Sequence, residues 1–428
     1  MSADPAFLVP HTLPNGLRIL CDPIPGLKTF ALSVMVRGGS RCETPAEAGW
    51  AHLLEHMVFK GAGGRSAREL AEVIEAEGGQ INAATAFEST RFEIRALDGL
   101  LPLCLSVLSD MIYRPTLDPE ELEREKQVVG QEIAEAFDTP DDHVFELAQA
   151  QAFAGQALGR PILGTSDSVG RATSETLSAF RAGLYDPSRT VICVSGAVRE
   201  DELLALCTRY FSEPGPDLRR LEPEPARFMG GEAVLARKIE QANLVFFLPG
   251  LARSSPDFYA MKLFAEILGG GMASRLFQKA REERGLAYTI DAFADLYEDT
   301  GTLGIFAGCA AQDAAPLAEL VGDEIRALAL DPQASELSRA KAQFRTALHM
   351  GRESAASRAS QYAGQLLNYG RTYSPEESEV ELNRVTLEDL RRVGQGLFAQ
   401  GQSVSAILGP KAAHKAASVF SASLARAI

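Results

Sequence analysis

The sequence lacks any long hydrophobic run. Nowhere in its 428 residues is there an apolar stretch of about 20 residues, the length that crosses a bilayer as a helix. Residues 1–11 also lack the basic flank and apolar core of a signal peptide. We therefore expect a cytoplasmic protein with no membrane partner.

Positive charge is also in short supply. The chain has 42 lysine and arginine residues against 57 aspartate and glutamate residues, for a net charge of −15. Nucleic-acid-binding domains usually carry an excess of basic residues, so we expect no nucleic-acid partner. An acidic surface suits basic peptides. The composition, 46% hydrophobic and 23% charged, is that of a globular protein, and the length allows two to four domains.

Cysteine is scarce and scattered. The six residues are Cys21, Cys42, Cys104, Cys193, Cys207 and Cys309. None forms the C-x-x-C pair of a zinc ribbon or a redox motif. We expect reduced, mostly buried thiols, as in a cytoplasmic protein.

One stretch, residues 49–57, carries candidate chemistry in the order H-x-x-E-H. His52 and His56 lie on one face of a helix because they are four residues apart, and Glu55 lies on the same side. Two such imidazoles can bind one zinc ion, while the carboxylate accepts a proton from an attacking water molecule. The alternative is an amphipathic core helix that contains two histidines.

A catalytic zinc ion needs a third protein ligand. The helical run 120–135 is rich in glutamate, and Glu125 and Glu132, seven residues apart, project from the same face. The alternative for such a run is a solvated charged surface.

Together the two stretches resemble the pitrilysin-type (M16, inverzincin) zinc metallopeptidases, in the subgroup of mitochondrial processing peptidase and its bacterial homologues. Counted from His56, the third ligand of that family falls on Glu132. The resemblance thus implies that Zn²⁺ is bound by His52, His56 and Glu132, with Glu55 as the general base. It also implies that Glu125 orients a ligand histidine.

The resemblance extends over nearly the whole chain. It includes Asn15-Gly16, Phe59-Lys60-Gly61 and Gly78-Gly79-x-x-Asn82-Ala83. In the family the last of these is an edge strand on which substrate lies as an added strand, so Asn82 and Ala83 are candidate substrate-binding residues. Trp50 replaces a smaller aliphatic residue and is expected to narrow the pocket.

The two halves of the sequence resemble each other. A proline-rich linker, 212–228, separates an N-terminal domain, 1–211, from a C-terminal domain, 229–428. Residues 173–196 match residues 386–409 in pattern at constant spacing, which indicates an internal duplication. Leu122-x-Arg124-x-Lys126 matches Leu337-x-Arg339-x-Lys341 with the spacing two residues longer, and on that register Glu125 faces Ala340 and Glu132 faces Ala347. The motif helix falls near 264–268, where apolar residues replace both histidines and Glu55, so we expect one metal site and not two.

Local patterns predict the elements of the first copy. We expect strands at 12–20, 30–36, 80–85 and 90–96, and helices at the motif, at 65–74, 101–113 and 120–137, and from 142 onward. Thr44-Pro45 is expected to start the motif helix. The fold class is thus α+β, a mixed α/β sandwich of two homologous domains, and the resemblance implies a clamshell arrangement.

The second copy carries a glycine-rich stretch, 269–277, followed by Arg281 and Tyr288. In the family an arginine and a tyrosine at this spacing reach the zinc site, so the resemblance implies that these two stabilise the oxyanion of the reaction. It further implies a homodimeric endopeptidase that cleaves short or unfolded peptides inside a closed chamber. The alternatives are a catalytic or a structural subunit of a heteromeric processing peptidase complex.

Overall fold

The computed structural model describes residues 7–215 and 222–426 and divides into two compact units. The first comprises Met1–Ile133, Pro161–Pro223 and Ala347–Glu377, and the second comprises Ala134–Arg160, Glu224–Thr346 and Ser378–Ile428. The chain passes between them five times: within the helices α4 (Pro119–Asp138), α11 (Ala334–Arg352) and α13 (Pro375–Arg384), and in the loops at residues 160–161 and 223–224.

The first unit is built on a six-stranded sheet in the order β1-β2-β8-β3-β7-β6. Its strands are β1 (His11–Thr12), β2 (Arg18–Pro23), β3 (Thr29–Val36), β6 (Gln80–Thr85), β7 (Thr90–Leu97) and β8 (Thr190–Gly196). Only β2 and β8 pair in parallel. A separate two-stranded ribbon joins β4 (Gly61–Ala62) to β5 (Arg65–Ser66).

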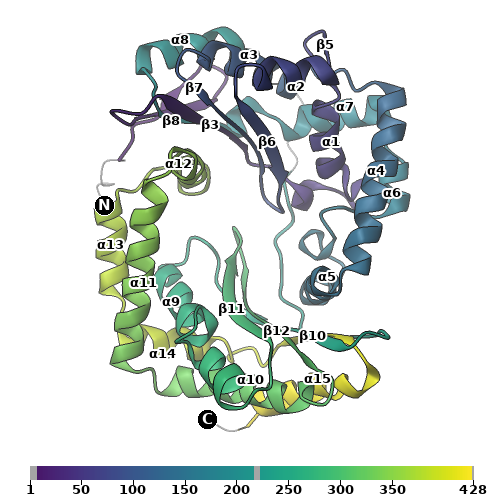
Figure 1. Cartoon of the computed structure of the whole chain (residues 1–428), viewed down its shortest axis with the longest axis vertical. Helices are drawn as coiled ribbons and strands as arrows, with labels where there is room; N and C mark the ends of the chain where they lie inside the picture. The colour runs from purple at the N-terminus through teal and green to yellow at the C-terminus, as the bar shows by residue number, and fades with distance from the viewer. Residues whose placement is uncertain (1–6, 216–221, 427–428) are drawn as a thin grey trace. The chain divides into compact units, whose positions relative to one another are not determined.

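Helices cover both faces of this sheet (Figure 1). One face is covered by helices of the first sequence half: α1 (Trp50–Val58), α2 (Ala67–Glu75), α3 (Leu101–Tyr113) and α8 (Glu200–Phe211), with α6 (Ser166–Gly170) and α7 (Ser174–Leu184) packed beside α1. The other face receives α12 (Ala355–Tyr369) from the second half, whose Tyr362 and Leu366 pack on Met35 and Cys193.

The second unit repeats this topology. Its five-stranded sheet has the order β11-β12-β10-β13-β9. The strands are β9 (Gly231–Ala236), β10 (Gln241–Pro249), β11 (Thr289–Leu296), β12 (Gly301–Ala310) and β13 (Val404–Gly409), with β13 and β9 parallel. Read strand for strand, β6-β7-β3-β8-β2 corresponds to β11-β12-β10-β13-β9.

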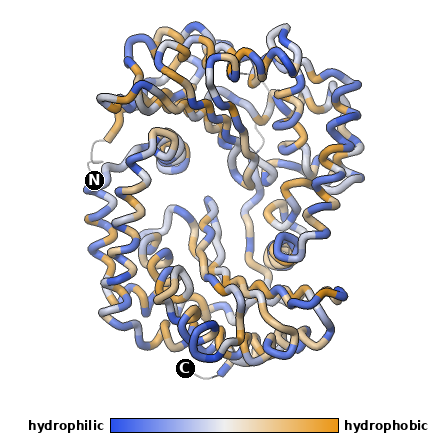
Figure 2. The backbone as a smooth tube through the Cα atoms, viewed as in Figure 1, coloured by the Kyte–Doolittle hydropathy of each residue, from blue (hydrophilic) through white to orange (hydrophobic). Residues whose placement is uncertain are grey.

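The helices of the second unit follow the same plan. They are α9 (Phe258–Gly269), α10 (Ala314–Leu330), α13 (Pro375–Arg384), α14 (Leu387–Gly396) and α15 (Lys415–Leu424), and α5 (Pro140–Ala152) from the first half packs on β10 and β13. Figure 2 shows hydrophobic stretches along the strands of both units, as expected for sheets covered on both faces. The mixed α/β fold class and the duplication are confirmed.

Each unit contains one helix from the other half of the sequence: α5 belongs to the second unit and α12 to the first. A division of the chain near residue 212 assigns α12 to the second copy, yet α12 packs on the sheet of the first unit. Of the predicted linker 212–228, residues 216–221 lie outside the described part, and the described residues on either side belong to no helix or strand. No helix in the described ranges combines the length and apolar character needed to cross a bilayer.

Most predicted elements of the first copy are present within a few residues, including the two central strands β3 and β7 and the helices α1 to α5. One start signal is wrong. Thr44 caps a short 3-10 helix, Pro45–Glu47, whereas α1 begins only at Trp50 after Gly49.

Candidate metal centre

The motif helix α1 is anchored by its apolar face. Leu53, Leu54 and Met57 are completely buried, which stabilises the fold by roughly 1.5–3 kcal/mol for each side chain. His52, Glu55 and His56 lie on the remaining face and stay partly accessible. The helix therefore presents these three side chains together, as the sequence spacing predicted.

The N-terminus of α1 is held by a residue that sequence reasoning missed. The buried carboxylate of Glu43 accepts hydrogen bonds from the backbone N–H groups of Gly49 (3.0 Å) and Ala51 (2.7 Å). A carboxylate here satisfies two of the unpaired donors of the first turn and complements the positive end of the helix dipole. A cap from six residues upstream matches no local capping pattern, so no sequence signal identified it.

Gly49 is required by its backbone conformation. Its φ is +88°, and a Cβ atom at this position would lie 2.4 Å from the carbonyl oxygen of Leu163. The following residue, Trp50, is buried, donates from its indole nitrogen to the Ser168 carbonyl (3.0 Å) and packs edge-on against Phe180. Trp50 thus anchors α1 to α6 and α7, and its side chain fills the core.

Three side chains converge on one point. Oε2 of Glu132, on α4, lies 3.7 Å from Nε2 of His52 and 3.6 Å from Nε2 of His56. Among the described residues, these three form the one group of histidine, cysteine and acidic side chains able to hold a metal ion. The structure thus brings together the three residues that the resemblance selected, although Glu132 is far from the motif in sequence.

The donor set fits zinc. A tetrahedral ion with bonds of about 2.0–2.2 Å places its ligand atoms about 3.3–3.5 Å apart, close to the two separations between Glu132 and the histidines. Oε2 of Glu132 is buried and has no hydrogen-bond partner among the described residues, an arrangement that costs free energy unless a cation is bound. Burial, followed by the charge of His56, lowers the pKa of His52 to about 4, so its imidazole is neutral and able to bind metal at neutral pH.

Glu125 contacts a candidate ligand and does not join the ligand cluster. Its Oε2 lies 3.0 Å from Nδ1 of His56, and its Oε1 lies 2.7 Å from Nζ of Lys60. The side chain of Glu125 is only 5% exposed, compared with 35% for Glu132. This position corresponds to the orienting role that the resemblance implied.

Glu55 stands beside the three candidate ligands without being one of them. Its Oε2 accepts a hydrogen bond from the Thr85 hydroxyl at 2.5 Å. Burial is the largest influence on this carboxyl group and raises its pKa, with the Thr85 hydrogen bond and His56 opposing the shift. Glu55 is therefore a partly buried carboxyl group, held at Thr85 beside the candidate ligands.

Asn82 and Ala83 lie on β6, the edge strand of the sheet. They pair with Glu93 and Phe92 of β7, which leaves the outer side of β6 without a neighbouring strand in the described sheet. Because Thr85 ends this strand and contacts Glu55, the open edge leads to the candidate centre.

Arg281 and Tyr288 both belong to the second unit. Arg281 lies in a π-helix, Phe277–Glu283, where its guanidinium stacks on the Phe277 ring at 4.8 Å. Tyr288 is 58% exposed, and its backbone N–H donates to the Gly308 carbonyl. Both side chains are thus accessible, and their relation to the metal centre stays a prediction.

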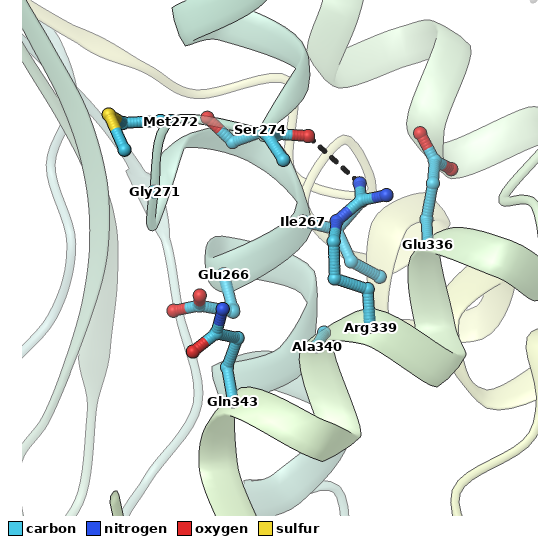
Figure 3. A pocket seen from close by; sticks show the side chains of 10 residues that line it. Glu266, Ile267, Gly271, Met272, Ser274, Glu336, Arg339, Ala340 and Gln343 are labelled. Carbon is cyan, nitrogen blue, oxygen red and sulfur yellow. Dashed lines mark hydrogen bonds between the residues drawn. The ribbon is translucent and has the colours of Figure 1, made fainter. Parts of the chain in front are cut away.

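The second unit has no counterpart of the metal cluster within its described residues. At the corresponding place α9 and α11 border a cavity of about 50 Å³ (Figure 3). Its lining includes Ile267 and Ala340, together with the polar side chains of Glu266, Ser274, Glu336, Arg339 and Gln343. Phe264 and Leu268, at the two histidine positions, are buried in the core. The fold and the site therefore define a class of protein: a duplicated α/β chain in which one half carries side chains that could hold a metal ion.

Comparison with known proteins gives the family. Residues 18–166 match the family Insulinase (Peptidase family M16), and residues 171–344 match the Peptidase M16 inactive domain. The chain belongs to peptidase family M16.

Two bacterial relatives cover nearly the whole chain. An uncharacterized zinc protease of Streptomyces coelicolor is 34% identical over 408 residues, 93% of this chain and 89% of the relative. Another from Bacillus subtilis is 34% identical over 398 residues, 93% of this chain and 97% of the relative. Zinc is thus the metal implied at the level of the family, and the predicted resemblance is confirmed.

Solved structures share the fold. A protease from Helicobacter pylori has a TM-score of 0.88 at 21% identity and covers 95% of this chain and 100% of its own. A chain of Complex III2 from Candida albicans has a TM-score of 0.81 at 20% identity, with coverage of 94% and 96%.

Proposed function

We propose that this chain is a zinc-dependent endopeptidase. The observation that carries the proposal is the buried, unpartnered Oε2 of Glu132, which faces the Nε2 atoms of His52 and His56. The three atoms form a donor set that leaves a fourth position for water or substrate. Zinc bound there supplies Lewis-acid activation of water and of the scissile carbonyl.

Glu55 is the general base of this proposal. Its carboxylate accepts the proton of the attacking water and then delivers it to the departing amine. The Thr85 hydroxyl holds Oε2 of Glu55 and so orients the carboxyl group beside the candidate ligands. Glu125 holds the Nδ1 side of His56, which keeps Nε2 directed toward Glu132.

The open edge of β6 is an argument that the substrate is a peptide. An extended peptide can add to such an edge through backbone hydrogen bonds, which makes binding tolerant of sequence. Asn82 and Ala83 would pair with it, and the strand ends at Thr85 beside the base. This mode requires an extended chain, so the proposed substrates are short or unfolded peptides.

Arg281 and Tyr288 complete the proposed site. Both side chains are exposed, and as hydrogen-bond donors they suit an oxyanion that develops during attack. We propose that they act when the two domains close on the substrate like a clamshell, in a closed chamber of a cytoplasmic homodimer. The alternative is a subunit of a heteromeric processing complex, catalytic or structural. The complete ligand set argues against the structural role.

The test is metal analysis combined with a quenched-fluorescence peptide assay. The purified full-length chain should contain about one zinc ion per polypeptide and cleave unfolded peptides. A chelator should abolish cleavage, and zinc should restore it. A chain that binds zinc and cleaves nothing until a second subunit is added would support the heteromeric alternative, and a chain without zinc affinity would overturn the proposal.

A further inference from the structure

Lys60 forms an ion pair beside the candidate centre that the proposed reaction does not use. It lies just beyond the end of α1, where its backbone N–H donates to the Met57 carbonyl at 3.1 Å. Its Nζ lies 2.7 Å from Oε1 of Glu125, and Oε2 of the same carboxylate lies 3.0 Å from Nδ1 of His56. Lys60, Glu125 and His56 thus form one continuous chain of contacts.

We propose that Lys60 is a positioning residue for the metal centre, which acts through Glu125 on His56. With Oε1 taken by Lys60, the carboxylate of Glu125 is fixed in rotation and presents Oε2 to the imidazole. A carboxylate at Nδ1 keeps the ring proton on that nitrogen and leaves the Nε2 lone pair toward Glu132, 3.6 Å away. Lys60 therefore acts indirectly: it holds Glu125, and Glu125 favours the tautomer of His56 that can bind metal.

The ion pair of Lys60 and Glu125 differs from an ordinary surface ion pair because its carboxylate is buried. The neighbouring pair on α4, Lys126 with Glu123, has a similar separation of 2.6 Å, but the Glu123 side chain is 70% exposed. Glu125 is 5% exposed, so the loss of Lys60 would leave a buried carboxylate with one charged partner fewer. The loss of Lys126 would leave the mostly exposed Glu123 carboxylate in water and remove a hydrogen bond to the Gly170 carbonyl, without contact to the metal centre.

The chain offers a matched set of variants. Lys60→Met removes the ammonium group and keeps the length of the side chain, Lys60→Arg keeps the charge, and Lys126→Met is the control on the same helix. Zinc affinity of the metal-free full-length protein is measured by competition with a chelating dye. The tautomer of His56 is read from long-range ¹H–¹⁵N spectra of metal-free protein labelled at histidine, and thermal unfolding shows whether each variant folds.

Lys60→Met should weaken zinc binding by about tenfold, at the lower end of the range for loss of a supporting partner. It should also raise the population of the Nε2–H tautomer of His56. Lys60→Arg should largely restore both, and Lys126→Met should change neither. In a Glu125→Gln background, Lys60→Met should add no further loss, because both residues act through one contact.

The inference rests on the proposed zinc site, and the two fail differently. If His52→Ala leaves zinc binding intact, the proposed site is wrong. If His52→Ala abolishes binding while Lys60→Met matches the wild type in affinity and tautomer, only the role of Lys60 is overturned. Losses from Lys60→Met and Glu125→Gln that multiply would overturn it too, because Lys60 would then act independently of Glu125.

Discussion

The Thr85 hydroxyl donates to Oε2 of Glu55 at 2.5 Å and so joins the edge strand β6 to the motif helix α1. The contact links the strand proposed to receive substrate with the residue proposed to activate water. It also fixes one oxygen of a carboxyl group whose pKa is raised by burial. Binding and proton transfer would therefore occur on one connected piece of the first unit.

Glu55→Gln should keep zinc and lose activity. The amide preserves the shape of the side chain but cannot accept a proton, so kcat should fall by roughly 10²–10⁴-fold. Zinc content measured by mass spectrometry should match the wild type. Wild-type turnover in the zinc-loaded variant would remove Glu55 from the role of base.

Glu132→Gln and Glu125→Gln should have different effects on zinc binding. Glu132 supplies a candidate ligand atom, so its loss should empty the site under dialysis. Among the candidate ligands Glu125 contacts only His56, at Nδ1, so its loss should weaken zinc affinity by roughly 10–100-fold and mainly reduce the rate. If Glu125→Gln emptied the site and Glu132→Gln did not, the two roles would be reversed.

Arg281→Ala and Tyr288→Phe should each lower kcat by roughly 10²–10³-fold, the range for loss of one oxyanion donor. Zinc content, oligomeric state and unfolding temperature should stay unchanged, because both side chains are exposed. Arg284→Ala, three residues further on, is the matched control and should retain activity.

Truncation would be a poor substitute for these variants. A fragment that ends near Ser212 lacks α12, which packs on the sheet of the first unit, so its loss of activity could reflect unfolding. Full activity in the double variant Arg281→Ala, Tyr288→Phe would instead contradict a role of the second domain in the chemistry.

Gly49→Ala should destabilise the first unit more than Gly64→Ala. Both glycines have positive φ, +88° and +83°, so both variants incur backbone strain of about 1–2 kcal/mol. At Gly64 a Cβ atom meets nothing within 4 Å, whereas at Gly49 it overlaps the Leu163 carbonyl, which should add about 1–3 kcal/mol.

The single tryptophan, Trp50, makes this comparison direct, because it lies on α1 and its fluorescence reports on that helix during urea unfolding. Equal urea midpoints for Gly49→Ala and Gly64→Ala would show that the close approach to the Leu163 carbonyl does not add to the loss of stability.

Acid should weaken the fold partly through His143 in the second unit. The pKa of His143 is lowered from its ordinary value, first by burial and second by the charge of Arg237. The unfolded chain therefore binds a proton at this site before the folded chain does, so the stabilisation is complete above about pH 6.5 and declines as the pH falls below that value.

His143→Phe should flatten this part of the stability profile of the metal-free protein. Arg237→Gln should flatten it only in part, because burial remains. An unchanged slope in His143→Phe would assign the acid sensitivity to other groups.

Local sequence pattern was sufficient for the motif helix and the central strands. The spacing of His52, Glu55 and His56 places them on one face of any helix, and the apolar residues between them determine which face is buried. The duplication was also visible in sequence, because each copy has to bury the same sheet with the same periodicity. Glu132 needed the family pattern, since local periodicity is equally compatible with Glu125 on the same helical face.

Contacts between distant segments were decided only by the tertiary structure. Glu43 caps α1 across a turn, Thr85 meets Glu55 from a neighbouring strand, and Lys60 meets Glu125 across two elements. The exchange of α5 and α12 belongs to the same group. By itself the sequence determined which residue types could hold a metal ion and on which helices they lie. Their separations, burial and partners depend on how those helices pack on the sheet, and no local periodicity encodes that packing.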